Sequence, residues 1–227
     1  MKKYVNLFVF VFMIGACLSQ GRAQTKSAVS YKNPVVDIAM PDPTVIKAAD
    51  GYFYVYATES TRNVPIMKSK DLVEWTYCNT AFTNKTRPRF EPKAGIWAPD
   101  INYINGKYVL YYAMSVWGGE QTCGIGVATA NSPQGPFTDH GKMFRSNEIG
   151  VQNSIDPSLL QYEGRNYLVW GSFRGIYVIE LTTDGLSIMP GAKKKRIAGT
   201  AFEAVYIHKH DDYYYMFASI GSCCQGV

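Results

Sequence analysis

Charged residues are scarce in this 227-residue chain, where lysine, arginine, aspartate and glutamate together make up 18%. This scarcity argues against a disordered or coiled-coil protein, because both classes are rich in charge. The sequence also has no convincing long amphipathic helix pattern, whereas tyrosine (17) and glycine (20) are plentiful. The composition therefore favours an all-β protein.

Basic residues and cysteines are too dispersed to mark a binding site. The net charge is +5, but only Lys193–Arg196 forms a basic run, which is typical of a solvated loop and argues against a nucleic-acid partner. The cysteine spacing matches no zinc site. Cys223 and Cys224 are adjacent and could bridge only with strain, so their disulfide state stays open between a bridge and buried thiols.

The chain lacks an apolar run long enough for a stable membrane span. Lys2 and Lys3 precede VNLFVFVFMIGACL, which has the length and flanks of a secretory signal peptide. Cleavage after Ala23 is predicted, so that residues 1–23 are the leader and 24–227 the folded domain. IGAC also resembles a lipoprotein-processing site at Cys17, and this alternative stays open. Both routes export the chain, so we expect a secreted or periplasmic protein, lipid-anchored if Cys17 is modified.

An aromatic, alternating strand pattern recurs four times along the chain. The copies start about 50 residues apart and read GYFYVYATES from Gly51, GKYVLYYAMS from Gly106, GRNYLVWGSF from Gly164 and DYYYMFASIG from Asp212. Further strand candidates between the copies read VPIMKSKD, VEWTYC, GIGVATA and GIYVIEL. A period of this length is typical of propeller blades. We therefore predict a β-propeller, with a sandwich of short strands as the alternative.

Each repeat also carries an acid shortly before its launching turn. The four segments read PDPTVI at Asp42, PDINYI at Asp100, IDPSLL at Asp156 and FEAVYI at Glu203. If these segments are the innermost strands of successive blades, we expect the acids to be quasi-equivalent and to gather at one end of the axis. Clustered carboxylates suit glycoside hydrolysis, in which one acid is protonated and another ionised. Turn formation by each Asp-Pro pair and calcium binding are the alternatives.

Together these motifs resemble glycoside hydrolase family 43. PDPTVI, GIWAPDINYINGKYVLYYAMS, NSIDPSLL and FEAVYI carry the resemblance from about Pro34 onward, and SVWGGEQTCGIGVATA, GSFRGI and GSCCQG look most like its endo-arabinanase branch. The resemblance implies a five-bladed β-propeller, of which about three and a half to four blades lie in this chain. It also implies a secreted enzyme that cleaves α-1,5-linked arabinan of the plant cell wall with inversion. The chemistry needs no cofactor, and a structural calcium on the axis stays open.

The resemblance assigns roles to the acids. Asp42 becomes the general base that activates water, Glu203 the general acid, and Asp156 the group that positions Glu203 and keeps it protonated. Asp100 becomes structural. Inversion would place the base and acid carboxyls roughly 6.5–9.5 Å apart.

The resemblance also predicts a sugar-binding surface. Trp97 would stack on a sugar ring, as aromatic side chains do, and Trp117 stands where the branch usually has phenylalanine. The catalytic subsite would be lined by Asn153, Ser154, Ile155, Ser172 and Phe173. No residue is predicted to bind a metal, and no oligomeric state is predicted.

Departures from the family pattern leave other functions open. Arg174 stands where the branch often has tryptophan, and Val205 replaces the usual proline after Glu-Ala. An exo-acting α-L-arabinofuranosidase or β-xylosidase on the same fold, and a non-catalytic carbohydrate-binding propeller, are the competing functions. The chain stops at Val227 within the fourth repeat. We therefore expect this polypeptide alone to be poorly stable and nearly inactive, because a missing blade leaves unpaired strand edges.

Overall fold

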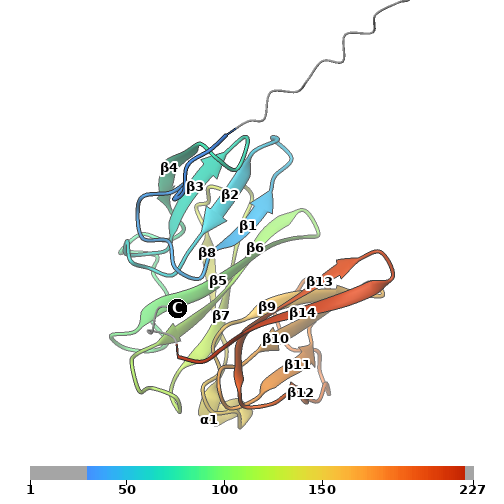
Figure 1. The fold of residues 1–227 in the computed structure, drawn as a ribbon. Helices are drawn as coiled ribbons and strands as arrows, with labels where there is room; N and C mark the ends of the chain where they lie inside the picture. The colour runs from blue at the N-terminus through green and yellow to red at the C-terminus, as the bar shows by residue number, and fades with distance from the viewer. Residues whose placement is uncertain (1–29, 223–227) are drawn as a thin grey trace, which may run out of the picture. The chain divides into compact units, whose positions relative to one another are not determined.

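The computed structural model describes residues 30–222, which form four antiparallel sheets in chain order (Figure 1). The elements are β1 (Thr44–Lys47), β2 (Phe53–Tyr56), β3 (Pro65–Ser69), β4 (Trp75–Thr80), β5 (Gly95–Ile104), β6 (Lys107–Ser115), β7 (Gly124–Ala130), β8 (Thr138–Arg145), α1 (Ser146–Ile149), β9 (Ser158–Tyr162), β10 (Arg165–Trp170), β11 (Ile176–Glu180), β12 (Lys195–Ala198), β13 (Phe202–His210) and β14 (Tyr213–Ile220). Within residues 30–222, three sheets have four strands each, and β13 and β14 form a two-stranded sheet. These are three blades and a half-blade of a β-propeller, as the repeat predicts.

The launching turns explain why each blade begins with a hairpin. Asn105 and Gly106, between β5 and β6, have φ values of 48° and 81°, and Glu163 and Gly164, between β9 and β10, have 48° and 73°. Two consecutive residues with positive φ match the twist of the flanking strands, and asparagine and glycine reach this conformation at low cost. The turn chemistry seen in the sequence therefore fixes the register of the first two strands.

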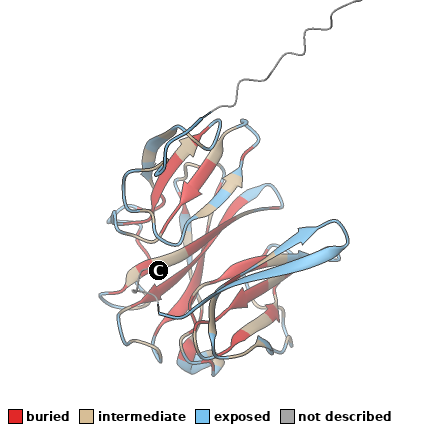
Figure 2. Cartoon of the chain, in the orientation of Figure 1, coloured by how far each residue is buried: buried red, intermediate tan, exposed pale blue. Residues whose placement is uncertain are grey.

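The second strand of a blade is buried on both faces, which explains its continuous aromatic and apolar sequence. In β6, Leu110 and Tyr112 point into a core shared with the first blade, whereas Val109 and Tyr111 point into a core shared with the third. Figure 2 shows this burial in β6 and β10, and it also shows that the β13–β14 hairpin is largely exposed. The packing between neighbouring blades is therefore the main apolar core of the described chain.

The first strands lie innermost. Strand β1 contacts β5, β5 contacts β9, and β9 contacts β13, so that one strand from each sheet lies beside the next. The predicted intervening strands are confirmed as β3, β4, β7 and β11. Strands β8 and β12 were not predicted, because TDHGKMFR and KRIA lack the apolar alternation of a half-buried strand.

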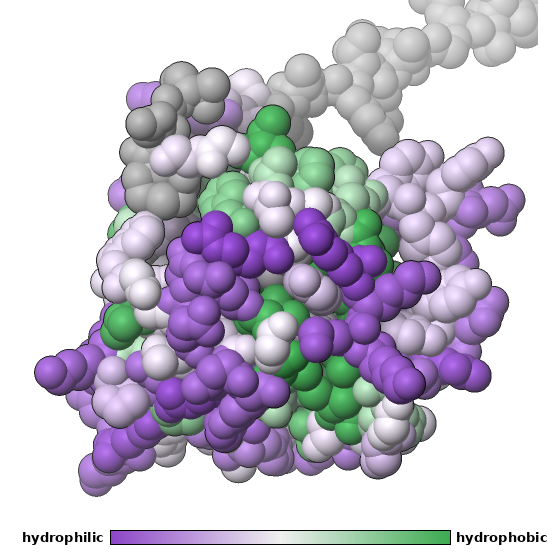
Figure 3. All heavy atoms as spheres, turned by 90° about the horizontal axis from the view of Figure 1, so that it is seen from below, coloured by the Kyte–Doolittle hydropathy of each residue, from purple (hydrophilic) through white to green (hydrophobic). Residues whose placement is uncertain are grey.

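Several sequence predictions fall outside residues 30–222. The leader at residues 1–23, Cys17, Cys223 and Cys224 all belong to this group, and the domain boundary after Ala23 stays a prediction. Within the described part, Cys78 and Cys123 are free thiols. No helix in this part of the chain is long and apolar enough to cross a membrane. Seen from below, the surface is mostly hydrophilic, with apolar patches between the polar side chains (Figure 3).

Candidate active site

Each first strand is interrupted, or preceded, by the same two-residue bulge. The first residue of each bulge has a left-handed backbone, with φ between 39° and 56°; these residues are Asp42, Ala98, Asp156 and Ala204. The hydrogen-bond register skips two residues there, as between Trp97 and Asp100 in β5 and between Glu203 and Tyr206 in β13. Bulges redirect side chains, and they are common beside active sites.

The bulges correct the predicted equivalence of the four acids. Only Asp42 and Asp156 occupy the same position, the first residue of a bulge. Glu203 lies one residue before its bulge, and Asp100 lies two residues after the left-handed Ala98. The prediction of equivalence was wrong because it matched the four repeats by their acidic residues. The equivalent backbone positions of the first strands are set by the bulges instead.

Asp156 lies at the centre of the acidic cluster. Its Oδ2 accepts a hydrogen bond from the backbone N–H of Ala204 at 3.2 Å, and the side chain is half-buried. Burial, followed by the nearby charges of Glu203 and Asp42, raises the pKa of Asp156 to about 7. The three predicted catalytic acids are therefore close enough to interact electrostatically.

Asp42 is exposed and is held by a hydroxyl that the sequence did not single out. Thr58 donates from Oγ1 to Oδ2 of Asp42 at 2.5 Å. The Oγ1 atom of Thr58 also accepts a hydrogen bond from the backbone N–H of Ala98 at 2.7 Å. Asp156 reaches the bulge of the next blade directly, whereas Asp42 reaches it through Thr58. Thr58 lies two residues beyond β2, and no sequence motif marked it, because its role depends on contacts with separate segments.

Glu203 is half-buried and contacts the third blade. The hydroxyl of Ser172 donates to Oε2 of Glu203 at 3.1 Å, and the two residues form an isolated antiparallel bridge. Phe173 N–H donates to the carbonyl of Phe202, so the chain before Glu203 is fixed at the same place. Ser172 is 2% exposed, and its hydroxyl orients the carboxylate of Glu203.

Asp100 has a structural environment. Its Oδ2 accepts the backbone N–H of Leu159 at 2.8 Å and the side-chain amide of Asn102 at 2.7 Å, while Thr44 donates to Oδ1 at 3.4 Å. These bonds join the first strands of three blades. Burial raises the pKa of Asp100 to about 6, although the three hydrogen bonds oppose that shift. The structural role implied by the family resemblance is consistent with this placement.

The two predicted sugar-stacking residues lie together. The ring centroids of Trp97 and Trp117 are 5.9 Å apart and the planes are tilted by 54°. Trp97 directly precedes the bulge in β5, as Glu203 directly precedes the bulge in β13. The two residues therefore occupy equivalent positions in the second and fourth blades of the propeller. A Cβ at Gly95 would lie 2.4 Å from Nε1 of Trp97, so only glycine leaves room for this indole. Trp117 is 79% exposed.

The predicted subsite lining is only partly brought to this region. Asn153 donates from Nδ2 to the carbonyl of Ser172 at 3.1 Å, and Ile155 packs against Trp97. Phe173 is half-buried beside Ser172. Ser154 is different: it is 0% exposed, and its hydroxyl donates to Val151 O and accepts from Nε1 of Trp170. The prediction that Ser154 lines the subsite is therefore wrong, because its hydrogen-bonding capacity is used inside the blade.

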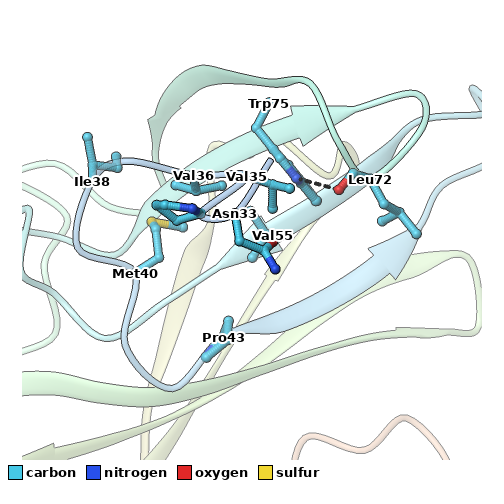
Figure 4. Close-up of a pocket in the computed structure, with 10 residues that line it drawn as sticks. Asn33, Val35, Val36, Ile38, Met40, Pro43, Val55, Leu72 and Trp75 are labelled. Carbon is cyan, nitrogen blue, oxygen red and sulfur yellow. Dashed lines mark hydrogen bonds between the residues drawn. The ribbon is translucent and has the colours of Figure 1, made fainter. Parts of the chain in front are cut away.

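One cavity of the described chain is lined by none of these carboxylates. Its volume is about 740 Å³, and it lies between the 33–40 segment and the first blade (Figure 4). Its lining includes Val36, Met40, Val55 and Trp75 and contains no acid or histidine, so it lacks the groups for hydrolysis. Among residues 30–222, no group of three or more His, Cys, Asp or Glu side chains could hold a metal ion. The axial calcium stays open, as in the sequence analysis.

The described fold and site define a β-propeller that carries three coupled carboxylates on its first strands. The family model "Glycosyl hydrolases family 43" matches residues 31–227, and the chain belongs to this family. The family resemblance and the propeller fold read from the sequence are therefore confirmed.

Several known proteins are similar to the chain. The extracellular endo-α-(1→5)-L-arabinanase 1 of Bacillus subtilis (strain 168) is 36% identical over 200 residues, which cover 82% of this chain and 61% of that protein. The solved structure of Cellvibrio cellulosa α-L-arabinanase complexed with arabinohexaose has a TM-score of 0.72 at 28% identity, covering 83% of this chain and 67% of that one. The solved structure of an exo-1,5-α-L-arabinanase from a bovine ruminal metagenomic library has a TM-score of 0.72 at 31% identity. The match covers 87% of this chain and 70% of that one. The chain spans about 60% of the length of the curated relatives it matches.

Proposed function

We propose that this chain belongs to an exported enzyme that hydrolyses α-1,5-linked L-arabinan at internal bonds. The observation that carries the proposal is the cluster of three carboxylates: Asp156 accepts the N–H of Ala204, directly after Glu203. Burial, and then the charges of Glu203 and Asp42, raise the pKa of Asp156. The B. subtilis relative named as an extracellular endo-arabinanase supports both the substrate and the export. The predicted signal peptide supports export independently.

The proposed chemistry is general acid and base catalysis with inversion. Glu203 protonates the glycosidic oxygen, and Asp42 removes a proton from the water that attacks the opposite face of the sugar. Ser172 orients the carboxyl of Glu203, and Thr58 orients that of Asp42. Asp156 fixes the backbone beside Glu203 through the N–H of Ala204. The spacing of the base and acid carboxyls required by inversion stays a prediction.

The aromatic pair supports a carbohydrate substrate. Trp97 packs against Ile155, the residue before Asp156, and its ring lies next to that of Trp117. Apolar ring faces of this kind pack against the C–H groups of a sugar ring. The Cellvibrio neighbour was solved with arabinohexaose, which supports an arabinan chain as the occupant. The proposed partner is therefore plant cell-wall arabinan.

The test uses protein expressed from its complete reading frame. It would be incubated with linear α-1,5-arabinan and, separately, with xylan, and product lengths would be followed over time. We expect short arabino-oligosaccharides from the parent and at least a hundredfold slower release by Glu203→Gln. Glu74→Gln, which alters an exposed carboxyl before β4, is the matched control and should act like the parent.

The product pattern decides between this proposal and its competitors. Release of arabinose alone would replace internal cleavage with exo cleavage, which the similarity to the exo-arabinanase makes the second candidate. Products from xylan but not from arabinan would assign a xylosidase. Unchanged function in Glu203→Gln, with sugar binding but no hydrolysis by the parent, would assign a binding propeller.

A further inference from the structure

An ion pair joins a loop of the second blade to the third blade. The loop comprises residues 116–123, between β6 and β7, and is called here the Glu120 loop. Arg174 donates from Nε to Oε2 of Glu120 at 3.0 Å and from Nη2 to Oε1 at 2.9 Å. Gln152 adds a bond from Nε2 to Oε2 at 2.6 Å. A two-point guanidinium–carboxylate contact fixes direction as well as distance.

The backbone of the same loop is also tied to the third blade. Asn153 N–H donates to the carbonyl of Glu120 at 2.7 Å. Within the loop, Gly119 N–H bonds to Val116 O at 2.9 Å and Cys123 N–H bonds to Gly119 O at 2.9 Å. These turns bond the two ends of the loop to Gly119, so holding Glu120 in place constrains the backbone that carries Trp117.

Trp117 needs such support because its own packing is slight. The side chain is 79% exposed, yet its ring lies 5.9 Å from that of the half-buried Trp97. Trp97 is held by its strand and by contacts with Ile155, whereas Trp117 is placed mainly by its loop. The relative position of the two indoles therefore depends on the connection between Glu120 and the third blade.

The guanidinium of Arg174 is already committed to protein acceptors. Besides the two bonds to Glu120, Nη1 donates to the carbonyl of Phe173 at 3.1 Å. Three of its five N–H groups are thus used within the protein. This arrangement suits a residue that positions a loop better than one that reaches for a sugar hydroxyl.

We infer that Arg174 and Glu120 are positioning residues that hold Trp117 against Trp97, so that the two rings form one preformed subsite for a pentose ring of the polysaccharide. The assignment of a pentose rests on the proposed function. The positioning itself rests only on the contacts above. The side chains of Arg174 and Glu120 make no hydrogen bond with the three proposed catalytic acids. Changing either residue should therefore affect substrate binding and leave the bond-breaking step unchanged.

The test combines kinetics with a spectroscopic signal of the indole pair. Two tryptophan rings this close give an exciton couplet in circular dichroism, which Trp97→Phe and Trp117→Phe should each abolish. In protein from the complete reading frame, Arg174→Ala should lower the couplet by half or more. It should also raise KM for arabino-oligosaccharides about three- to tenfold while kcat stays within about twofold. Arg174→Lys should fall between parent and alanine variant, because lysine cannot make the two-point contact.

Two further variants make the result specific. Arg165→Ala removes an exposed ion pair with Glu180 on the same sheet and should change neither the couplet nor KM. The exchange Arg174→Glu with Glu120→Arg should recover part of the couplet and of KM relative to either single variant. Thermal unfolding of each variant would show that the fold is retained.

The outcomes separate the inference from the proposed function. An unchanged couplet in Arg174→Ala, or a fall in kcat with KM unchanged, would overturn the inference while leaving arabinan hydrolysis intact. A parent that is inactive on arabinan but loses its couplet in Arg174→Ala would support the positioning and reject the pentose. An active parent with the KM and couplet changes described above would support both.

Discussion

Asp156 accepts a hydrogen bond from the backbone N–H of Ala204, the residue that directly follows Glu203. This bond joins the third blade to the fourth at the point where the proposed acid emerges, and it lies beside a carboxyl pair that interacts electrostatically. Asp156 therefore acts on both the geometry and the charge of the site, and its protonation should be visible in the stability of the protein.

Stability should fall as pH rises through the range in which Asp156 and Asp100 lose their protons. Their pKa values are about 7 and about 6 in the folded chain, against an ordinary aspartate value of 3.8. The folded state therefore binds these protons more tightly than the unfolded state, so the contribution is complete below about pH 4 and is lost as pH rises to about 7. Denaturant unfolding should be measured between pH 4 and 8 for the parent and for Asp156→Asn. The free energy of unfolding should fall less steeply with pH in the variant, and the two slopes should differ by at most about 1.4 kcal/mol per pH unit. Identical slopes in parent and variant would contradict this prediction.

The hydroxyl of Thr58 should matter more than its methyl group. Thr58→Val keeps the shape but removes the oxygen that joins Asp42 to the N–H of Ala98, so the proposed base loses its orientation. We expect kcat on arabinan to fall about tenfold or more, because positioned proton transfer contributes at least that much. Thr58→Ser retains the hydroxyl and should keep most of the activity. Equal rates in the valine and serine variants would show that the hydroxyl has no such role.

Ser172 should affect kcat more than KM. Ser172→Ala removes the hydroxyl that donates to Oε2 of Glu203 and leaves a half-buried carboxylate with one partner fewer. The expected result is a fall in kcat of about tenfold, with a shift in the pH profile of the same parameter. Ser187→Ala, at an exposed position between β11 and β12, is the control and should behave like the parent. A rise in KM alone would instead assign Ser172 to substrate binding.

Asp100 should be needed for stability. Asp100→Ala leaves the N–H of Leu159, the amide of Asn102 and the hydroxyl of Thr44 without their shared acceptor. We expect a loss of about 3 kcal/mol in the free energy of unfolding, because buried donors lose their partners at the junction of three blades. Asp212→Ala, on the exposed turn after β13, should cost less than about 0.5 kcal/mol. A comparable effect of the two variants, measured by denaturant midpoint, would rule out the inter-blade role.

The sequence was sufficient to predict the blades because their second strands are unusual. A strand such as β6, buried on both faces, must be aromatic or apolar throughout, and its preceding turn must tolerate positive φ. Both requirements leave a visible pattern every time the blade repeats. Outer strands such as β8 and β12 carry no comparable requirement, and their sequences did not reveal them.

The site was predicted less completely because its decisive contacts join distant segments. Asp42, Asp156 and Glu203 could be named from their motifs, but Thr58 and Glu120 act through partners 16 and 54 residues away. Ser154 was assigned to the subsite from the family resemblance of NSIDP, whereas its side chain is buried inside the blade. The bulges could not be predicted either, because one extra residue in a strand leaves no mark in the composition of the sequence.

The repeated left-handed bulge has a consequence for how such a scaffold can change over evolutionary time. Ala98 and Ala204 hold the same backbone conformation that presents Asp42 and Asp156, and aspartate tolerates that conformation better than alanine does. A single codon change at either alanine would introduce a new carboxylate with no change in the path of the chain. Each of these bulges can therefore present a different side chain at the same backbone position. A new catalytic group can arise in one blade while the other blades keep their fold and function.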